Sequence, residues 1–180
     1  MPEAIAGMII SKAALAAAAF TYYIKKSQGR HDFTSTAFGV LYAMCGYFVA
    51  YYWNVMWLDS FYLFPLVILG IEQLISQRKM KLYTIALALT LITNYYMGYM
   101  VCIFSVLYFI YRYLSSFTFT ETYFGKLAKR EKGVKGFFIW AYNNLRNSKF
   151  FDSGVRFAFS SIGAALLSCF AILPVYFILM

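Results

Sequence analysis

The stretch that decides the fold is LYTIALALTLITNYYMGYMVCIFSVLYFIY, residues 82–111, which contains no charged side chain. Lys81 precedes it and Arg112 follows it, and basic residues that flank apolar segments gather on the cytoplasmic side of a membrane. A single helix of this length would reach on the order of 45 Å and would place the two basic residues on opposite sides. We therefore predict a helical hairpin that enters and leaves by the same side. Its turn is expected in TNYYMGYM, where Asn94 and Gly98 interrupt the apolar pattern.

Each half of this hairpin is expected to be too short to cross the hydrocarbon core, which takes about 20 residues of helix. The irregular turn must then be shielded by protein or line a wet cavity, because unpaired backbone groups are costly in lipid. Asn94, Tyr95, Tyr96 and Tyr99 place polar groups at this turn. Two interpretations remain open: these side chains bind a ligand in a cavity, or they satisfy the broken helix ends.

The composition of the chain requires a membrane environment. Of its 180 residues, 62% are hydrophobic and only 13% are charged, which is too much apolar surface for a soluble domain of this size. The net charge of +9 would suggest a nucleic-acid partner in a soluble protein. Here, however, every Lys and Arg except Lys12 falls in one of three clusters beside apolar runs, at 25–30, 78–81 and 112–156. We therefore assign the positive charge to membrane topology and to anionic lipids, and expect no nucleic-acid partner.

The apolar runs together predict an all-α integral membrane protein, a multi-pass helical bundle that forms a single domain. The basic cluster after the first run places the end of that run in the cytoplasm. The region that follows has no Lys or Arg before residue 78 and predicts an outward hairpin, with Trp53 and Trp57 at the far interface. Aromatic and basic residues near the end of the cytoplasmic loop are typical of a helix in the headgroup plane. The predicted segments are spans at about 3–24, 35–53 and 58–75, a broken hairpin at 82–113, a basic cytoplasmic loop at 114–154 and a final span at 155–180.

Three charged residues stand out in this membrane topology. Lys12 lies inside the first span, where an ammonium group costs several kcal/mol unless it faces a cavity, a partner or the interface. It either snorkels or pairs with a carboxylate of a neighbouring helix, or it binds an anionic group such as a lipid phosphate. Asp59 is a candidate base, metal ligand or partner of Lys12, or else the N-cap of the third span. Glu72 is expected to pair structurally with Arg78 or Lys79 at the cytoplasmic boundary.

Motifs of nucleotide and hydrolytic chemistry are absent from the sequence. There is no Walker A loop, no Gly-rich dinucleotide turn, no HExxH and no nucleophile elbow. The residues therefore predict no cofactor, and a divalent metal stays an open alternative.

Three stretches of the chain resemble the bacterial YfhO family of multi-pass membrane proteins. They are NVMWLDSFYLFPLVILGIEQL at 54–74, KLYTIALALTLITNYYMGYMVCIFSVLYFIYRYL at 81–114 and FAFSSIGAALLSCFAILPV at 157–175. The resemblance covers essentially all of the chain but a minor part of a typical family member. It implies the organisation of GT-C glycosyltransferases, which take sugar from a polyprenyl-phosphate donor at the outer membrane face. The implied partners are membrane lipids, a polyprenyl-phosphate-linked sugar and a cell-envelope polymer acceptor such as teichoic acid, at a bacterial cell membrane.

The resemblance also implies roles for individual residues. In the GT-C class the key acidic residues lie in the first extracytoplasmic loop, which has no counterpart here, so Met1 is expected to match an internal position of the family pattern. Lys12 is then the implied cation that stabilises the phosphate leaving group. Asp59 is the implied catalytic residue of this segment, as a secondary acid or metal partner, with the principal base outside the chain. The hairpin turn supplies the remaining implied substrate-binding residues, Asn94, Tyr95, Tyr96 and Tyr99.

A transporter or flippase subunit is the alternative function, because broken intramembrane helices are also typical of transporters. A noncatalytic membrane remnant or assembly partner is a third interpretation.

Overall fold

The computed structural model describes residues 2–29, 32–116 and 148–179, and all regular structure in these ranges is helical. This confirms the predicted all-α class. Four segments, Glu3–Gln28, Phe33–Tyr51, Val55–Gln77 and Asp152–Ala171, are long and apolar enough to cross a membrane. The helices are α1 (Pro2–Gln28), α2 (Phe33–Ala43), α3 (Gly46–Tyr51), α4 (Val55–Gln77), α5 (Lys81–Thr93), α6 (Tyr95–Ser116) and α9 (Ser148–Leu179).

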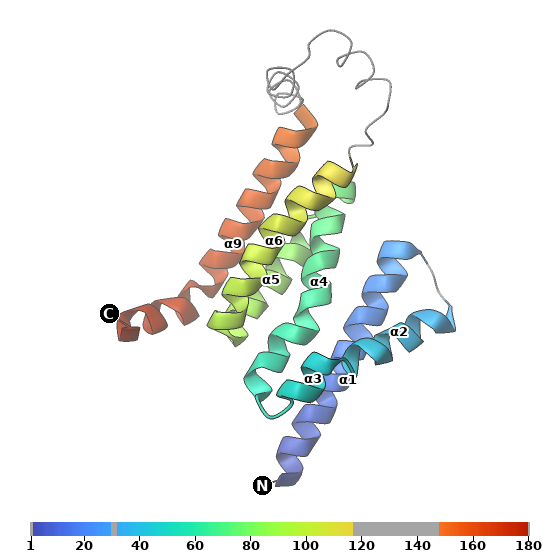
Figure 1. The fold of residues 1–180 in the computed structure, drawn as a ribbon. Helices are drawn as coiled ribbons and strands as arrows, with labels where there is room; N and C mark the ends of the chain where they lie inside the picture. Colours follow the sequence, from blue (N-terminus) through green and yellow to red (C-terminus); the bar gives the residue numbers. More distant parts are fainter. Residues whose placement is uncertain (1, 30–31, 117–147, 180) are drawn as a thin grey trace, which may run out of the picture.

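Helix α4 is the central element of the bundle. In the 18-residue apolar window of α4, 44% of the residues are buried, against 11% in the corresponding window of α1. Figure 1 shows α1 and α2 on one side of α4, with α5, α6 and α9 on the other. The hydrophobic core lies on the second side, where Val67, Ile71 and Leu74 of α4 pack with buried side chains of α5, α6 and α9. The helices α1 and α2 therefore add to a core that the other helices build around α4.

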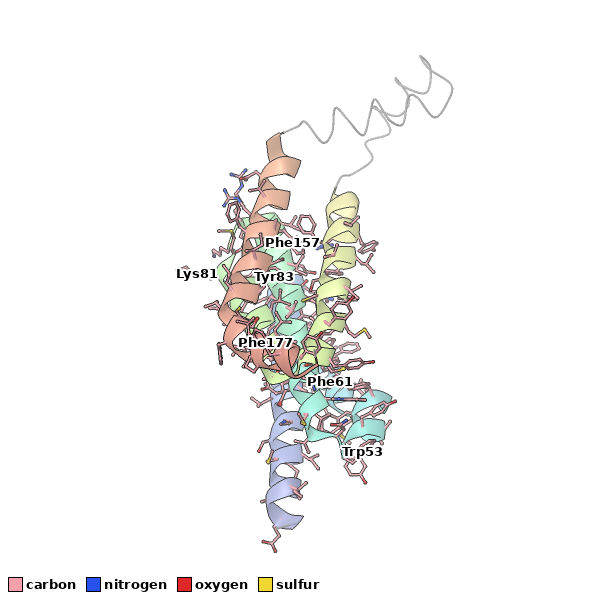
Figure 2. The ribbon with its side chains drawn as sticks, turned by 90° about the vertical axis from the view of Figure 1, so that its left-hand side faces the viewer. Trp53, Phe61, Lys81, Tyr83, Phe157 and Phe177 are labelled. Carbon is pink, nitrogen blue, oxygen red and sulfur yellow. The ribbon has the colours of Figure 1, made fainter. Side chains whose placement is uncertain are left out.

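Small residues bring neighbouring helices into backbone contact. A Cβ atom at Gly70 of α4 would lie 2.6 Å from the Cα atom of Tyr83 in α5. The ring of Tyr83 in turn stacks on Phe157 of α9, with centroids 5.3 Å apart (Figure 2). On the other side, a Cβ atom at Gly39 of α2 would lie 2.6 Å from the carbonyl oxygen of Ala17 in α1. Close approach at small residues is a common way to gain van der Waals contact between helices in a membrane.

The stretch predicted to fold back on itself forms two antiparallel helices, α5 and α6. Helix α5 has 13 residues and α6 has 22, which correspond to about 20 Å and 33 Å. Helix α5 is shorter than a membrane span, whereas α6 has the length of one but is not among the four described segments that are both long and apolar enough to cross. The expectation that neither half crosses therefore stays a prediction. The chain breaks at Asn94, whose Oδ1 accepts a hydrogen bond of 3.1 Å from the backbone N–H of Met97. Asn94 thus caps the start of α6.

The basic residues that flank this hairpin lie at one end of the bundle. At this end α4 and α6 finish and α5 and α9 begin (Figure 1). Arg112 Nε lies 3.9 Å from Glu72 Oε1 of α4, and Arg78 directly follows α4. Arg78 and Arg112 therefore emerge on the same surface. The positive-inside rule assigns this basic end to the cytoplasm.

The apolar run at 35–53 does not form one continuous helix. Helix α2 stops at Ala43, and α3 begins at Gly46 after a short break at Met44 and Cys45. Glycine is a poor helix former because the unfolded chain loses more backbone freedom there. The break could not be predicted from composition, because the residues on both sides of it are apolar.

The start of α4 differs from the prediction in a way that matters for Asp59. The helix begins at Val55 after Asn54, so Asp59 lies in its second turn. The prediction that Asp59 caps the helix start is therefore wrong, and its carboxylate is available for another partner.

The predicted cytoplasmic loop at 114–154 lies mostly outside the described residues, as does most of the segment expected in the headgroup plane. Both neighbouring helices extend into the predicted loop, because α6 continues to Ser116 and α9 already begins at Ser148.

The contact at Gly70 provides a test of the packing between α4 and α5. We expect Gly70→Ala to destabilise the protein by about 1–3 kcal/mol, because the new methyl group has no space beside the Tyr83 backbone. Gly154→Ala is the matched control, since nothing lies within 4 Å of a Cβ atom at that position. Thermal unfolding of the detergent-solubilised protein measures both, and equal stability of the two variants would contradict this packing.

Candidate functional site: polar contacts along helix α4

Lys12 of α1 and Asp59 of α4 form an ion pair. The Lys12 Nζ atom lies 2.6 Å from Asp59 Oδ1 and donates a hydrogen bond of 2.9 Å to the carbonyl oxygen of Val55. The two side chains are only 15% and 21% exposed. Among the alternatives weighed from sequence, the structure shows the one in which Lys12 pairs with a carboxylate of a neighbouring helix. An ammonium group has three N–H donors, so these two contacts leave one for a further acceptor.

The ion pair lies towards the end of the bundle that faces away from the basic residues. Lys12 is about 20 Å along α1 from Lys25 at the basic end. Val55 and Asp59 belong to the first two turns of α4, whereas Arg78 follows its last turn. The positive-inside rule, which assigns the basic end to the cytoplasm, therefore predicts the pair towards the outer leaflet.

Asn94 approaches the same turn of α4 as Lys12. Its Nδ2 atom lies 3.5 Å from the carbonyl oxygen of Met56, the residue after the Val55 carbonyl that binds Lys12. Through its cap on α6, Asn94 satisfies one of the open backbone groups at the hairpin turn. The structure thus brings Lys12, Asp59 and Asn94 to the same turns of α4, and the assignment of Asn94 to substrate binding stays a prediction.

The three tyrosines of the hairpin turn do not join this cluster. Tyr95, Tyr96 and Tyr99 are 47%, 56% and 56% exposed. Tyr96 makes a loose ring contact with Trp57 of α4, with centroids 6.3 Å apart. The assignment of these three tyrosines to substrate binding stays a prediction.

An apolar groove of about 350 Å³ lies over α4 between α2 and α3 on one side and α6 on the other. Phe61 forms its aromatic base and stacks on Tyr42 and Tyr47, with centroids 4.4 Å and 5.5 Å apart. The hydroxyl groups of Tyr47 and Ser60 are buried in this wall without a hydrogen-bond partner among the described residues. Helix α6 contributes the opposite wall: Met97, Met100, Val101 and Phe104. Sequence reasoning missed the groove because its walls come from four helices and share no periodic pattern.

Glu72 is the centre of a second polar cluster, near the basic end. Its Oε2 atom accepts a hydrogen bond of 2.6 Å from Ser27 of α1, and its Oε1 atom accepts one of 2.8 Å from Tyr108 of α6. The Tyr23 hydroxyl also lies within 3.3 Å of Oε1. With Arg112 as its ion-pair partner, Glu72 joins three helices through one carboxylate.

The partner of Glu72 differs from the sequence-based prediction. Arg78 was expected to pair with it but lies 3.7 Å from Asp152 of α9 instead. The antiparallel course of α5 and α6 brings Arg112 back to α4, and this proximity is not visible in the linear sequence.

Metal binding finds no support among the described residues, where no three His, Cys, Asp or Glu side chains are grouped closely enough to hold an ion.

Comparison with known proteins identifies the family. Residues 1–180 match the family described as bacterial membrane protein YfhO. The chain belongs to the YfhO family. A similar protein is the uncharacterized protein YfhO of Bacillus subtilis (strain 168), which is 32% identical over 100 residues. The matched region covers 54% of this chain but only 11% of that YfhO protein, and no solved structure matches the chain. Family membership and the four long apolar helices together indicate a membrane location.

The ion pair predicts a non-additive effect on stability. We expect Asp59→Ala to cost about 2–3 kcal/mol, because it leaves the Lys12 ammonium group largely buried without its counter-ion. The double variant Lys12→Met/Asp59→Leu is expected to recover most of this loss, since it removes both charges. Thermal unfolding of the four proteins in a double-mutant cycle measures the coupling, and additive losses would show that the pair does not form.

The Glu72 cluster predicts a difference between two tyrosines of the same helix. Tyr108→Phe removes one hydrogen bond to the Glu72 carboxylate and is expected to lower the free energy of unfolding by about 1–2 kcal/mol. Tyr111→Phe serves as the control because Tyr111 is 65% exposed. Chemical denaturation in detergent compares the two variants, and a loss of equal size in both would speak against the cluster.

Proposed function

We propose that this chain is part of a multi-pass membrane glycosyltransferase that transfers a sugar from a polyprenyl-phosphate donor to a cell-envelope polymer such as teichoic acid. The observation that carries the proposal is the ion pair between Lys12 and Asp59. The pair holds a cation, with one N–H donor left for a further acceptor, between α1 and α4 at the end of the bundle away from the basic residues. Membership in the YfhO family supports the same conclusion.

The proposed role of Lys12 is to bind the phosphate group of the donor. When the sugar leaves, negative charge increases on the phosphate oxygens, and a fixed ammonium group stabilises that charge in a low-dielectric environment. The contact of 2.6 Å with Asp59 and the bond to the Val55 carbonyl hold the ammonium group in place before the reaction. Such preorganisation avoids the cost of reorienting a flexible lysine in the transition state.

The geometry limits what Asp59 can do in this reaction. Its carboxylate serves as the counter-ion of Lys12, so it would have to release the ammonium group before it could accept a proton. We therefore assign Asp59 the role of a positioning residue. The base that accepts the proton of the acceptor hydroxyl is proposed to lie outside this segment of the protein.

The apolar groove is a candidate site for the polyprenyl chain of the donor. Aromatic and methionine side chains adapt well to an irregular apolar ligand. Ser60 in the groove wall directly follows Asp59 in α4. The groove and the ion pair both lie in the first half of α4, so we propose that a lipid chain in the groove brings its phosphate group to Lys12 around the first turns of this helix.

Substitution of Lys12 tests the proposed function. In membranes that contain the full-length protein, Lys12→Met is expected to lower sugar transfer from a polyprenyl-phosphate donor by about a hundredfold or more. Lys12→Arg, which keeps the charge, is expected to retain part of the activity. Lys25→Met is the matched control, because it removes a lysine from the same helix at the basic end, and it is expected to leave transfer unchanged.

Two results would overturn the proposal. One is full sugar transfer by a correctly inserted Lys12→Met protein. The other is movement of the lipid-linked sugar between leaflets without transfer to any acceptor, which would favour the transporter or flippase alternative.

A further inference from the structure

A second pocket lies at the basic end of the bundle, away from the groove and the ion pair. Its volume is about 400 Å³, and it is bordered by α1, α4 and α6. Three cationic side chains line it: Lys26 near the end of α1, Lys79 after α4 and Arg112 of α6. One carboxylate, Glu72, faces these three cations. The lining therefore carries net positive charge and favours an anion.

Glu72 does not cancel this preference, because its oxygens already have partners. Ser27 and Tyr108 donate hydrogen bonds of 2.6 Å and 2.8 Å to the two oxygens, and Arg112 is the ion-pair partner. Lys26 and Lys79, in contrast, have no carboxylate within ion-pair distance among the described residues. Glu72 thus connects α1 and α6, which border the pocket, through its own hydrogen bonds and ion pair. The ammonium groups of Lys26 and Lys79 are available to bind an anionic ligand.

The depth of the pocket indicates what kind of anion it fits. Glu72 lies five residues before Gln77, the last residue of α4, or about 8 Å below the helix end. The pocket therefore extends from the level of the helix ends, where lipid headgroups lie, to the edge of the hydrocarbon layer. Leu69 and Ile75 supply an apolar part of its lining, whereas Ser76 and Gln73 supply hydrogen-bonding groups. A phosphate group attached to acyl chains matches both kinds of surface.

We propose that this pocket binds the phosphate headgroup of an anionic phospholipid from the cytoplasmic leaflet. Lys26 and Lys79 contact the phosphate oxygens, and the acyl chains leave past Leu69 and Ile75. The bound lipid bridges α1 and α4 beside the Glu72 cluster. This site does not depend on sugar transfer, because it lies at the opposite end of α4 from the Lys12 and Asp59 pair.

Two pairs of neighbouring basic residues provide a sharp test. Lys26 and Lys79 line the pocket, whereas Lys25 and Arg78 stand next to them in the sequence but do not. The variants K26Q/K79Q and K25Q/R78Q therefore remove equal charge from the same end of the bundle. The purified full-length protein in a neutral detergent is titrated with phosphatidylglycerol, phosphatidylcholine and inorganic phosphate, and bound ligand is measured by native mass spectrometry.

We expect the wild-type protein to retain phosphatidylglycerol in preference to phosphatidylcholine. The affinity for phosphatidylglycerol is expected to fall at least about tenfold in K26Q/K79Q and much less in K25Q/R78Q. Equal losses in the two variants would show only general charge attraction and would overturn the proposal. Retention of phosphatidylcholine as strong as that of phosphatidylglycerol would also overturn it. Inorganic phosphate that binds as tightly as the lipid, with the same dependence on Lys26 and Lys79, would identify a soluble anion site instead. Thermal unfolding of both variants confirms that each remains folded.

Discussion

The attachment of α1 to α4 through two carboxylates is the interaction on which the proposed sites depend. A bilayer gives apolar helices little reason to associate, because lipid chains are as apolar as leucine side chains. Only 11% of the 18-residue apolar window of helix α1 is buried, so this helix gains little from packing alone. Asp59 holds it through Lys12 at one end, and Glu72 holds it through Ser27 and Tyr23 at the other. Both contacts withdraw polar groups from lipid, so they favour one arrangement of the two helices.

This attachment also explains where the two pockets lie. The pair of α1 and α2 stands on one side of α4, and the packed unit of α5, α6 and α9 stands on the other (Figure 1). The apolar groove and the basic pocket both open between these two groups, with α4 as their common wall. Phe64 of α4 and Phe104 of α6, with ring centroids 5.0 Å apart, both line the apolar groove. The pocket at the basic end is lined by cationic side chains, whereas the groove nearer the opposite end is lined by aromatic and methionine side chains.

Much of the fold could be predicted from where charges are missing. The absence of charge between Lys81 and Arg112 indicated a hairpin, and the polar Asn94 that interrupts the apolar pattern indicated its turn. The same reasoning failed on lengths and local breaks. Apolar composition does not show that α6 continues for 22 residues or that α2 stops before Gly46, because lipid accepts apolar side chains on any helix face.

The helical class, the end of the bundle that carries the basic residues and the need of Lys12 for a partner follow from the order of the residues alone. They reflect the cost of placing polar or charged groups in hydrocarbon, which depends on residue type and position along the chain. Which partners meet depends on how the helices pack. Lys12 pairs with Asp59, which the sequence left as one of several alternatives, and Glu72 pairs with Arg112 rather than with its sequence neighbours. Contacts between helices depend on their rotation and crossing, and these are set by close approaches such as the one at Gly70, which apolar periodicity does not encode.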